Sequence, residues 1–151
     1  MTTISHKLSV NLKSELKNAE EIWVAVGLLN LTGLDFLLQA LPDTCKLNFI
    51  VGIDLPTDPK ALIKLLSLKG KRTTNVKILT ESFFHPKVYI IKSHKLFTAF
   101  IGSANCTNGG LNANIEMSIG TKETNICKEL IGWFENTLLP ISQPLTSDFI
   151  A

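Results

Sequence analysis

The sequence has few cysteines and little net charge, and both scarcities exclude classes of protein. Cys45, Cys106 and Cys127 lie far apart and form no C-x-x-C pair, so neither a zinc site nor a disulfide framework is indicated. Such usage is typical of a reducing compartment, and we expect a cytoplasmic protein. The formal net charge is only +2, so any nucleic-acid-binding surface must be local.

Long apolar runs and acidic clusters are also missing. Residues 1–18 contain no central apolar block of the kind found in signal peptides. Polar residues, among them Asn30 and Asp35, interrupt the apolar segment 24–41, which favours a buried strand followed by a helix over a membrane span. No acidic cluster has the spacing of a magnesium site, so we expect neither a metal nor another cofactor.

What is present is the pattern of one α/β domain over residues 1–151. Apolar residues make up 45% of the 151 positions and charged residues 19%, which is typical of a globular chain with a substantial core. Asp58-Pro59 is a helix start signal. This alternation of elements predicts a mixed β-sheet flanked by helices on both faces. Residues 142–151 are predicted to be a tail or the stub of a linker. The predicted helices are 9–19, 34–41, 59–68 and 125–138, and the predicted strands are 22–29, 46–53, 76–79, 88–91, 97–101 and 115–119.

Chemically useful side chains gather around the last three predicted strands. His85 and Lys87 are separated by one residue at the start of a strand, so their side chains should emerge on the same face. Ser103 and Asn105 follow the end of the next strand, and Glu116 begins the one after. An imidazole, an ammonium, a hydroxyl, an amide and a carboxylate at neighbouring strand ends suit a tetrahedral oxyanion, above all a phosphodiester.

These motifs resemble the phospholipase D superfamily. The family signature His-x-Lys corresponds to His85-Pro86-Lys87, and its Gly/Ser-Ser-x-Asn segment corresponds to Gly102-Ser103-Ala104-Asn105. The continuation from Thr107 to Glu116 also looks like family members, which often carry Thr-x-x-Gly-Leu and then Asn-x-Glu. Many members have Asp five residues after the Lys, whereas this chain has Lys92. That difference resembles the branch of metal-independent nucleases and restriction enzymes.

The resemblance implies a role for each motif residue. His85 would attack phosphorus to give a covalent phosphohistidine, and Glu116 would orient its imidazole. Lys87 and Asn105 would hold the non-bridging oxygens, and Ser103 would add a hydrogen bond to the phosphate or to a residue of the site. A second histidine is needed to protonate the leaving oxygen. Because the chain has one His-x-Lys motif, we expect a homodimer with a composite site on its two-fold axis.

The partner expected from this resemblance is nucleic acid, DNA in preference to RNA, and no membrane. Lys69, Lys71, Arg72 and Lys92 are candidate contacts to the phosphate backbone, although the first three could equally form a solvated turn. No helix-turn-helix or zinc finger is visible, so a separate domain or subunit would supply sequence specificity. Two alternatives stay open: a lipid phosphodiesterase or phosphatidyltransferase, and a non-catalytic phosphate-binding module of a larger defence or repair protein.

Overall fold

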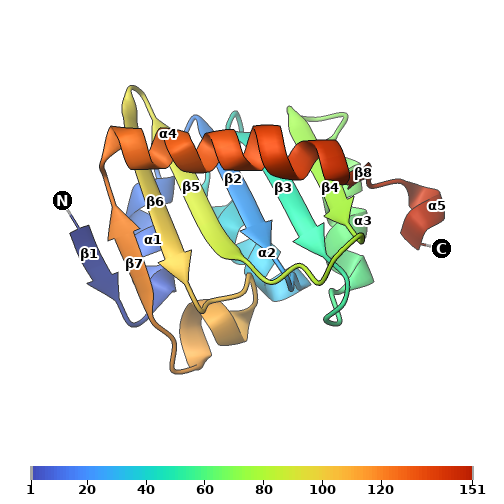
Figure 1. Ribbon diagram of the computed structural model, residues 1–151, viewed down its shortest axis with the longest axis horizontal. Coiled ribbons are helices and arrows are strands. Elements are labelled where there is room, and N and C mark those ends of the chain that lie inside the picture. The colour runs from blue at the N-terminus through green and yellow to red at the C-terminus, as the bar shows by residue number, and fades with distance from the viewer. Residues whose placement is uncertain (1, 151) are drawn as a thin grey trace.

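The computed structural model describes residues 2–150, in which eight strands form one mixed sheet (Figure 1). The strand order across the sheet is β1-β7-β6-β5-β2-β3-β4-β8. The strands are β1 Thr2–Ser5, β2 Glu21–Val26, β3 Lys46–Gly52, β4 Thr74–Leu79, β5 Lys87–Ser93, β6 Leu96–Gly102, β7 Ser118–Thr121 and β8 Gln143–Pro144. The helices are α1 Leu8–Leu16, α2 Leu31–Ala40, α3 Pro59–Leu68, α4 Thr124–Gly132 and α5 Ser147–Ile150, with short helical turns η1 Gly109–Ala113, η2 Trp133–Leu138 and η3 Leu139–Ile141.

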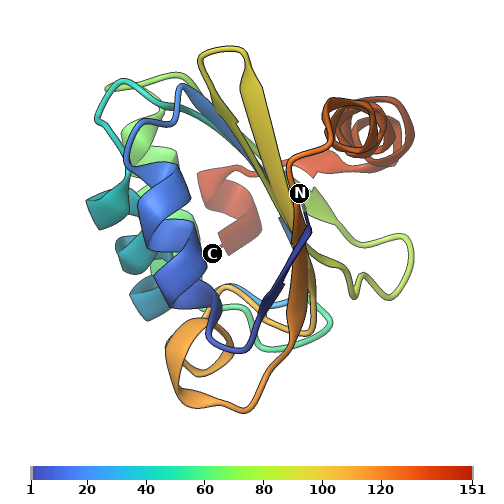
Figure 2. The ribbon, with the colours of Figure 1, turned by 90° about the vertical axis from the view of Figure 1, so that its left-hand side faces the viewer.

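The sheet has a smaller parallel part and a larger antiparallel part. β2, β3 and β4 run parallel and are joined through α2 and α3, the crossover helices that parallel neighbours require. β5 pairs antiparallel with β2, and β6, β7 and β1 continue this antiparallel part; β8 also pairs antiparallel, with β4. Helices α1, α2 and α3 cover one face, and α4 crosses the other (Figure 2). The predicted mixed sheet with helices on both faces is therefore confirmed.

Both faces of the central strands are buried, which explains their continuous apolar sequences. Along β5, Tyr89 and Ile91 belong to the core beneath α1, α2 and α3, whereas Val88 and Ile90 belong to the core beneath α4. This alternation is the two-residue period of a strand. Trp23, 5% exposed, packs in the second core.

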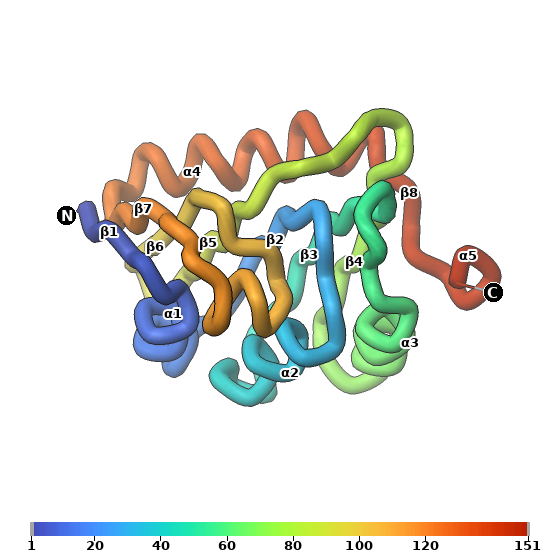
Figure 3. The backbone as a smooth tube through the Cα atoms, turned by 90° about the horizontal axis from the view of Figure 1, so that it is seen from below, coloured from blue at the N-terminus to red at the C-terminus, as the bar shows by residue number. Residues whose placement is uncertain are grey.

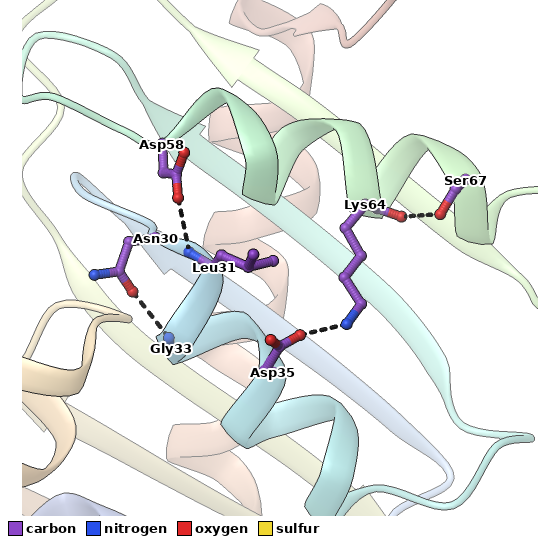
Figure 4. A network of polar contacts seen from close by, with 7 residues as sticks. All are labelled: Asn30, Leu31, Gly33, Asp35, Asp58, Lys64 and Ser67. Atoms are coloured by element: carbon purple, nitrogen blue, oxygen red, sulfur yellow. Dashed lines mark hydrogen bonds and ion pairs between the residues drawn. The ribbon is translucent and has the colours of Figure 1, made fainter.

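The starts of α2 and α3 are tied to each other by polar contacts (Figure 4). Asn30 caps α2 by accepting a hydrogen bond (2.9 Å) from the backbone N–H three residues further on. Asp58 caps α3 and also accepts a bond (3.3 Å) from the backbone N–H of Leu31. An ion pair joins Asp35 of α2 to Lys64 of α3. These contacts fix the loops that follow β2 and β3.

The structure departs from the predicted elements at the sheet edges and before β7. β1 has no predicted counterpart. The strand predicted over 115–119 begins only at Ser118, because β6 ends opposite that residue and offers no partner to the preceding ones; Glu116 thus lies in a loop. Residues 143–150, assigned from the sequence to a tail, form β8 beside β4 and then α5, with Leu145 buried in the core.

Candidate active site

The candidate residues meet at one end of the strands because of how β5 pairs with β2. Val26 at the end of β2 lies opposite Lys87 at the start of β5, and Gly102 at the end of β6 lies opposite Ser118 at the start of β7. The loops that carry the motif residues therefore emerge at the same end of the sheet's strands (Figure 3). The carboxyl ends of β2, β3 and β4 lie there as well, which is the usual place for a site in an α/β fold.

His85 and Lys87 lie in direct contact, as their spacing predicts. The Lys87 Nζ is 3.0 Å from Nδ1 and 3.2 Å from Nε2 of His85, and it donates a hydrogen bond (2.9 Å) to the carbonyl oxygen of His85. His85 is exposed, whereas Lys87 is only 9% exposed. Burial lowers the pKa of Lys87 below its ordinary value of 10.5, and the charge of Glu116 opposes this effect. An imidazole open to solvent thus rests on a nearly buried cation.

The loop between β4 and β5 is held close to the end of β2. The backbone N–H of Gly27 donates to the carbonyl oxygen of Pro86 (3.1 Å). A Cβ at Gly27 would lie 2.5 Å from the carbonyl oxygen of Phe84, so only glycine permits this approach. Phe83, also in the loop, stacks on the imidazole of His85 with ring centroids 5.3 Å apart and an angle of 28° between the rings. The sequence does not indicate Phe83 as a site residue, because an aromatic residue before a strand is ordinarily interpreted as part of the core.

Asn105 lies in a segment that the molecule anchors on both sides. The buried hydroxyl of Tyr89 donates to the carbonyl oxygen of Ala104 (2.8 Å), and Cys106 exchanges backbone hydrogen bonds with Leu28 (3.2 Å) and Asn30 (3.1 Å). Burial raises the pKa of Tyr89 well above its ordinary value, so its hydroxyl remains a donor. Within residues 2–150, the Oδ1 atom of Asn105 is buried and has no hydrogen-bond partner, which is rare. That oxygen can only accept a hydrogen bond, so a contact of Asn105 to a phosphate oxygen would come from its amide N–H groups.

Cys106 is fully buried. Burial raises the pKa of its thiol, so the group stays protonated and is a poor nucleophile.

Ser103 follows the end of β6, and Glu116 lies in the loop that leads into β7. The Oγ atom of Ser103 accepts a hydrogen bond from the backbone N–H of Met117 (3.0 Å) and donates to its carbonyl oxygen (3.3 Å). Ser103 thereby holds the chain at the start of β7, next to Glu116. Within residues 2–150 of one chain, no hydrogen bond joins Glu116 to His85; the carboxylate acts on Lys87 through its charge instead. The orienting role of Glu116 stays a prediction.

The four basic candidates for nucleic-acid contacts lie at the opposite ends of the strands from His85. Lys92 is opposite Glu21 at the start of β2, and the turn with Lys69 and Lys71 leads into the first residue of β4. Since strands rise about 3.4 Å per residue, Lys92 is about 17 Å along β5 from Lys87. The guanidinium of Arg72 is occupied by the carbonyl oxygens of Pro42 and Cys45. These residues do not extend the site around His85.

A groove of about 780 Å³ opens beside His85, between α4 and the loop that connects β4 to β5. Its floor is the sheet surface, and α4 supplies its wall. Apart from His85 and Lys87, its lining is mainly apolar and includes Val88, Ile101, Ile126, Leu130 and Trp133. The groove is invisible in the sequence because its residues come from three separate segments. Within the described residues, no helix combines the length and apolarity needed to cross a membrane, and no group of three or more His, Cys, Asp or Glu could hold a metal ion.

Comparisons with known proteins identify the fold. No curated protein sequence matches the chain. The structure of NucT from Helicobacter pylori is similar with a TM-score of 0.72 at 18% identity, over 95% of this chain and 98% of that one. Nuc from Salmonella typhimurium, a phospholipase D family member, gives 0.70 at 14% identity, over 97% and 100% of the two chains. The yeast tyrosyl-DNA phosphodiesterase gives 0.53 at 15% identity, over 80% of this chain and 32% of that one. A family model described as "Cardiolipin synthase, PLD-like domain" matches residues 12–138, and the chain therefore belongs to the phospholipase D superfamily.

Proposed function

We propose that this protein is a metal-independent phosphodiesterase, and specifically an endonuclease that cleaves nucleic-acid phosphodiester bonds through a phosphohistidine. The observation that carries the proposal is the direct contact between the exposed imidazole of His85 and the nearly buried ammonium of Lys87. A neutral imidazole is a competent nucleophile, and the adjacent cation neutralises the phosphate that it attacks.

The reaction proceeds in two displacements at phosphorus. A ring nitrogen of His85 forms a bond to phosphorus while the bond to the leaving oxygen breaks, and a second imidazole gives that oxygen a proton. The same second imidazole then takes a proton from water, whose oxygen attacks phosphorus and releases His85. Lys87 and Asn105 stabilise the non-bridging oxygens in both steps; each such interaction typically contributes about 10²- to 10³-fold to the rate.

The second imidazole comes from another copy of the chain. Ile4, Ile119 and Ile101 are paired across β1, β7 and β6, and they are 62%, 54% and 42% exposed. Because Ile101 is also paired with Val88, this row lies on the α4 face, continuous with the groove beside His85. A two-fold axis through that apolar surface would bury the row and bring two copies of His85 together.

Nucleic acid is the substrate that the comparisons favour. Tyrosyl-DNA phosphodiesterase acts, as its name says, on a phosphodiester of DNA, and its fold is similar to that of this chain. We infer DNA rather than RNA for the same reason. Sequence specificity, if the enzyme has any, would come from a separate domain or subunit.

A lipid phosphodiester is the second candidate, and the groove is the observation that favours it. An apolar channel of about 780 Å³ beside His85 has room for part of an acyl chain, and the matching family model carries the name of a cardiolipin synthase.

The deciding experiment is a cleavage assay on single-stranded and plasmid DNA with excess EDTA, with phosphatidylglycerol vesicles assayed in parallel. We expect DNA cleavage that survives chelation and disappears in His85→Ala, with an unchanged melting temperature as the control for folding. Turnover of lipid alone would replace the nuclease by the second candidate, and loss of activity on chelation would refute the metal-free mechanism.

The composite site has its own test. When wild type and His85→Ala are co-expressed in equal amounts, about one quarter of the dimers contain two intact copies, so activity should fall to about a quarter of the wild-type value. Independent sites would leave about half. Sedimentation of the wild type as a monomer would also refute the composite site.

A further inference from the structure

The proposed chemistry leaves the exposure of the Phe83 side chain unexplained. Its side chain is 62% exposed, although it lies in the loop directly before His85 and stacks on the imidazole of that residue. The neighbouring Phe84 is, by contrast, 5% exposed and part of the core under α4. What sets Phe83 apart from the other exposed apolar side chains is its position, stacked on the imidazole of His85.

We propose that Phe83 is a stacking platform for the nucleobase beside the scissile phosphodiester, and that it makes the enzyme prefer an unpaired strand. The proposal rests on the nuclease function proposed above. One face of the Phe83 ring is covered by His85, at 5.3 Å between centroids, and its exposure leaves the other face for a ligand. A phosphate attacked by His85 carries nucleosides on both oxygens, so a base lies within reach of that face.

An unpaired base is required because the faces of a base in a duplex are already covered by its neighbours. Stacking on Phe83 needs a base that has left such a stack, and a single strand meets this condition with the smallest penalty. Aromatic side chains serve this purpose in proteins that bind single strands without sequence preference, because every base has an aromatic face.

The charges around the site favour stacking over phosphate contacts as the source of affinity. The loops at these strand ends carry the carboxylates of Asp54, Glu81 and Glu116, and the charge of Glu116 acts on Lys87. Lys92 lies about 17 Å away along β5, and Lys69 and Lys71 lie in the turn before β4, at the opposite ends of the strands. A duplex, which proteins hold chiefly through many phosphate contacts, finds few cations here.

The experiment is a double-mutant cycle between Phe83 and the base. The substrate is a ten-nucleotide single strand with one cleavable phosphodiester, flanked on either side by thymidine or, in separate substrates, by an abasic residue. We expect Phe83→Ala to lower kcat/KM about 5- to 150-fold on the thymidine substrate, mainly through KM, and to have little effect on the abasic substrate. Phe83→Trp should restore activity, whereas Phe83→Leu, which keeps apolar bulk without an aromatic face, should not.

Two outcomes overturn the inference while the nuclease function stands. An equal loss on thymidine and abasic substrates would mean that Phe83 only positions His85. Sedimentation of Phe83→Ala as a monomer, beside a dimeric wild type, would mean that the ring belongs to a subunit interface. If the wild type cleaves neither substrate, the proposed function itself has failed.

Discussion

Tyr89→Phe tests whether a single buried hydroxyl holds the Asn105 segment over the site. Tyr89 is 2% exposed, and its hydroxyl donates to the carbonyl oxygen of Ala104 at 2.8 Å. Phenylalanine keeps the ring and removes the donor, so the carbonyl oxygen is left buried without this partner. Such a loss costs about 1 to 3 kcal/mol of the free energy of unfolding.

For a chain of 151 residues, this corresponds to a melting temperature lowered by about 3 to 9 °C, since unfolding entropy is about 2.1 cal/mol/K per residue. We also expect kcat for DNA cleavage to fall roughly tenfold, because Asn105 follows Ala104 directly and small displacements of a positioned group are costly. Urea and thermal unfolding followed by circular dichroism measure the first effect, and single-turnover cleavage measures the second.

The matched control is Thr74→Val, at the start of β4 and so at the opposite ends of the strands from the site. Thr74 is also buried, and its hydroxyl donates to the carbonyl oxygen of Arg72 (3.1 Å). This variant should lose stability and keep its cleavage rate. Our reasoning is refuted if Tyr89→Phe melts like the wild type, or if both variants lose activity in proportion to their loss of stability.

Three further predictions concern the groups around His85. Because burial lowers the pKa of Lys87, the ammonium deprotonates below pH 10.5, so kcat/KM should decline on the alkaline side of its pH profile; an active Lys87→Arg variant, whose guanidinium stays charged, should lack this decline, and an identical decline would contradict the assignment. Asn105→Asp places a carboxylate where a phosphate oxygen is to be held, so steady-state kinetics should show kcat/KM lowered about 10²- to 10³-fold with the circular dichroism spectrum unchanged; near-normal activity would remove Asn105 from the site. Gly27→Ala should shift the backbone of Phe84 and lower both the free energy of unfolding, by about 1 to 3 kcal/mol, and the activity. Gly70→Ala, whose added Cβ would point into open space, should lower neither. Equal effects of the two variants in urea unfolding and in cleavage would show that the close approach at Gly27 is unimportant.

Local chemistry in the sequence predicts much of what the structure contains. The Asp58-Pro59 signal marks the start of α3, because a capping carboxylate followed by proline suits the first turn of a helix. The spacing of His85 and Lys87 predicts their contact, because alternate residues of a strand share a face. Family membership likewise follows from short motifs whose residues are close in the chain.

The edge strands of the sheet could not be predicted from such local patterns. β1 and β8 are short segments with little apolar pattern, and they become strands only because β7 and β4 offer unpaired backbone groups. The hydrogen bonds of Ser103 to Met117, and the loop that places Glu116 near Lys87, likewise depend on where β6 stops pairing.

Local sequence patterns show which residue types are available for chemistry and which of them lie at strand ends. Which strand ends lie next to each other depends on long-range pairing in the fold. The antiparallel pairing of β5 with β2 places Lys87 beside the end of β2 and Lys92 beside its start, although the two lysines are close in the chain. That pairing joins residues more than sixty positions apart, so no local pattern records it, and it separates the site around His85 from the basic residues that the sequence had suggested would share its substrate.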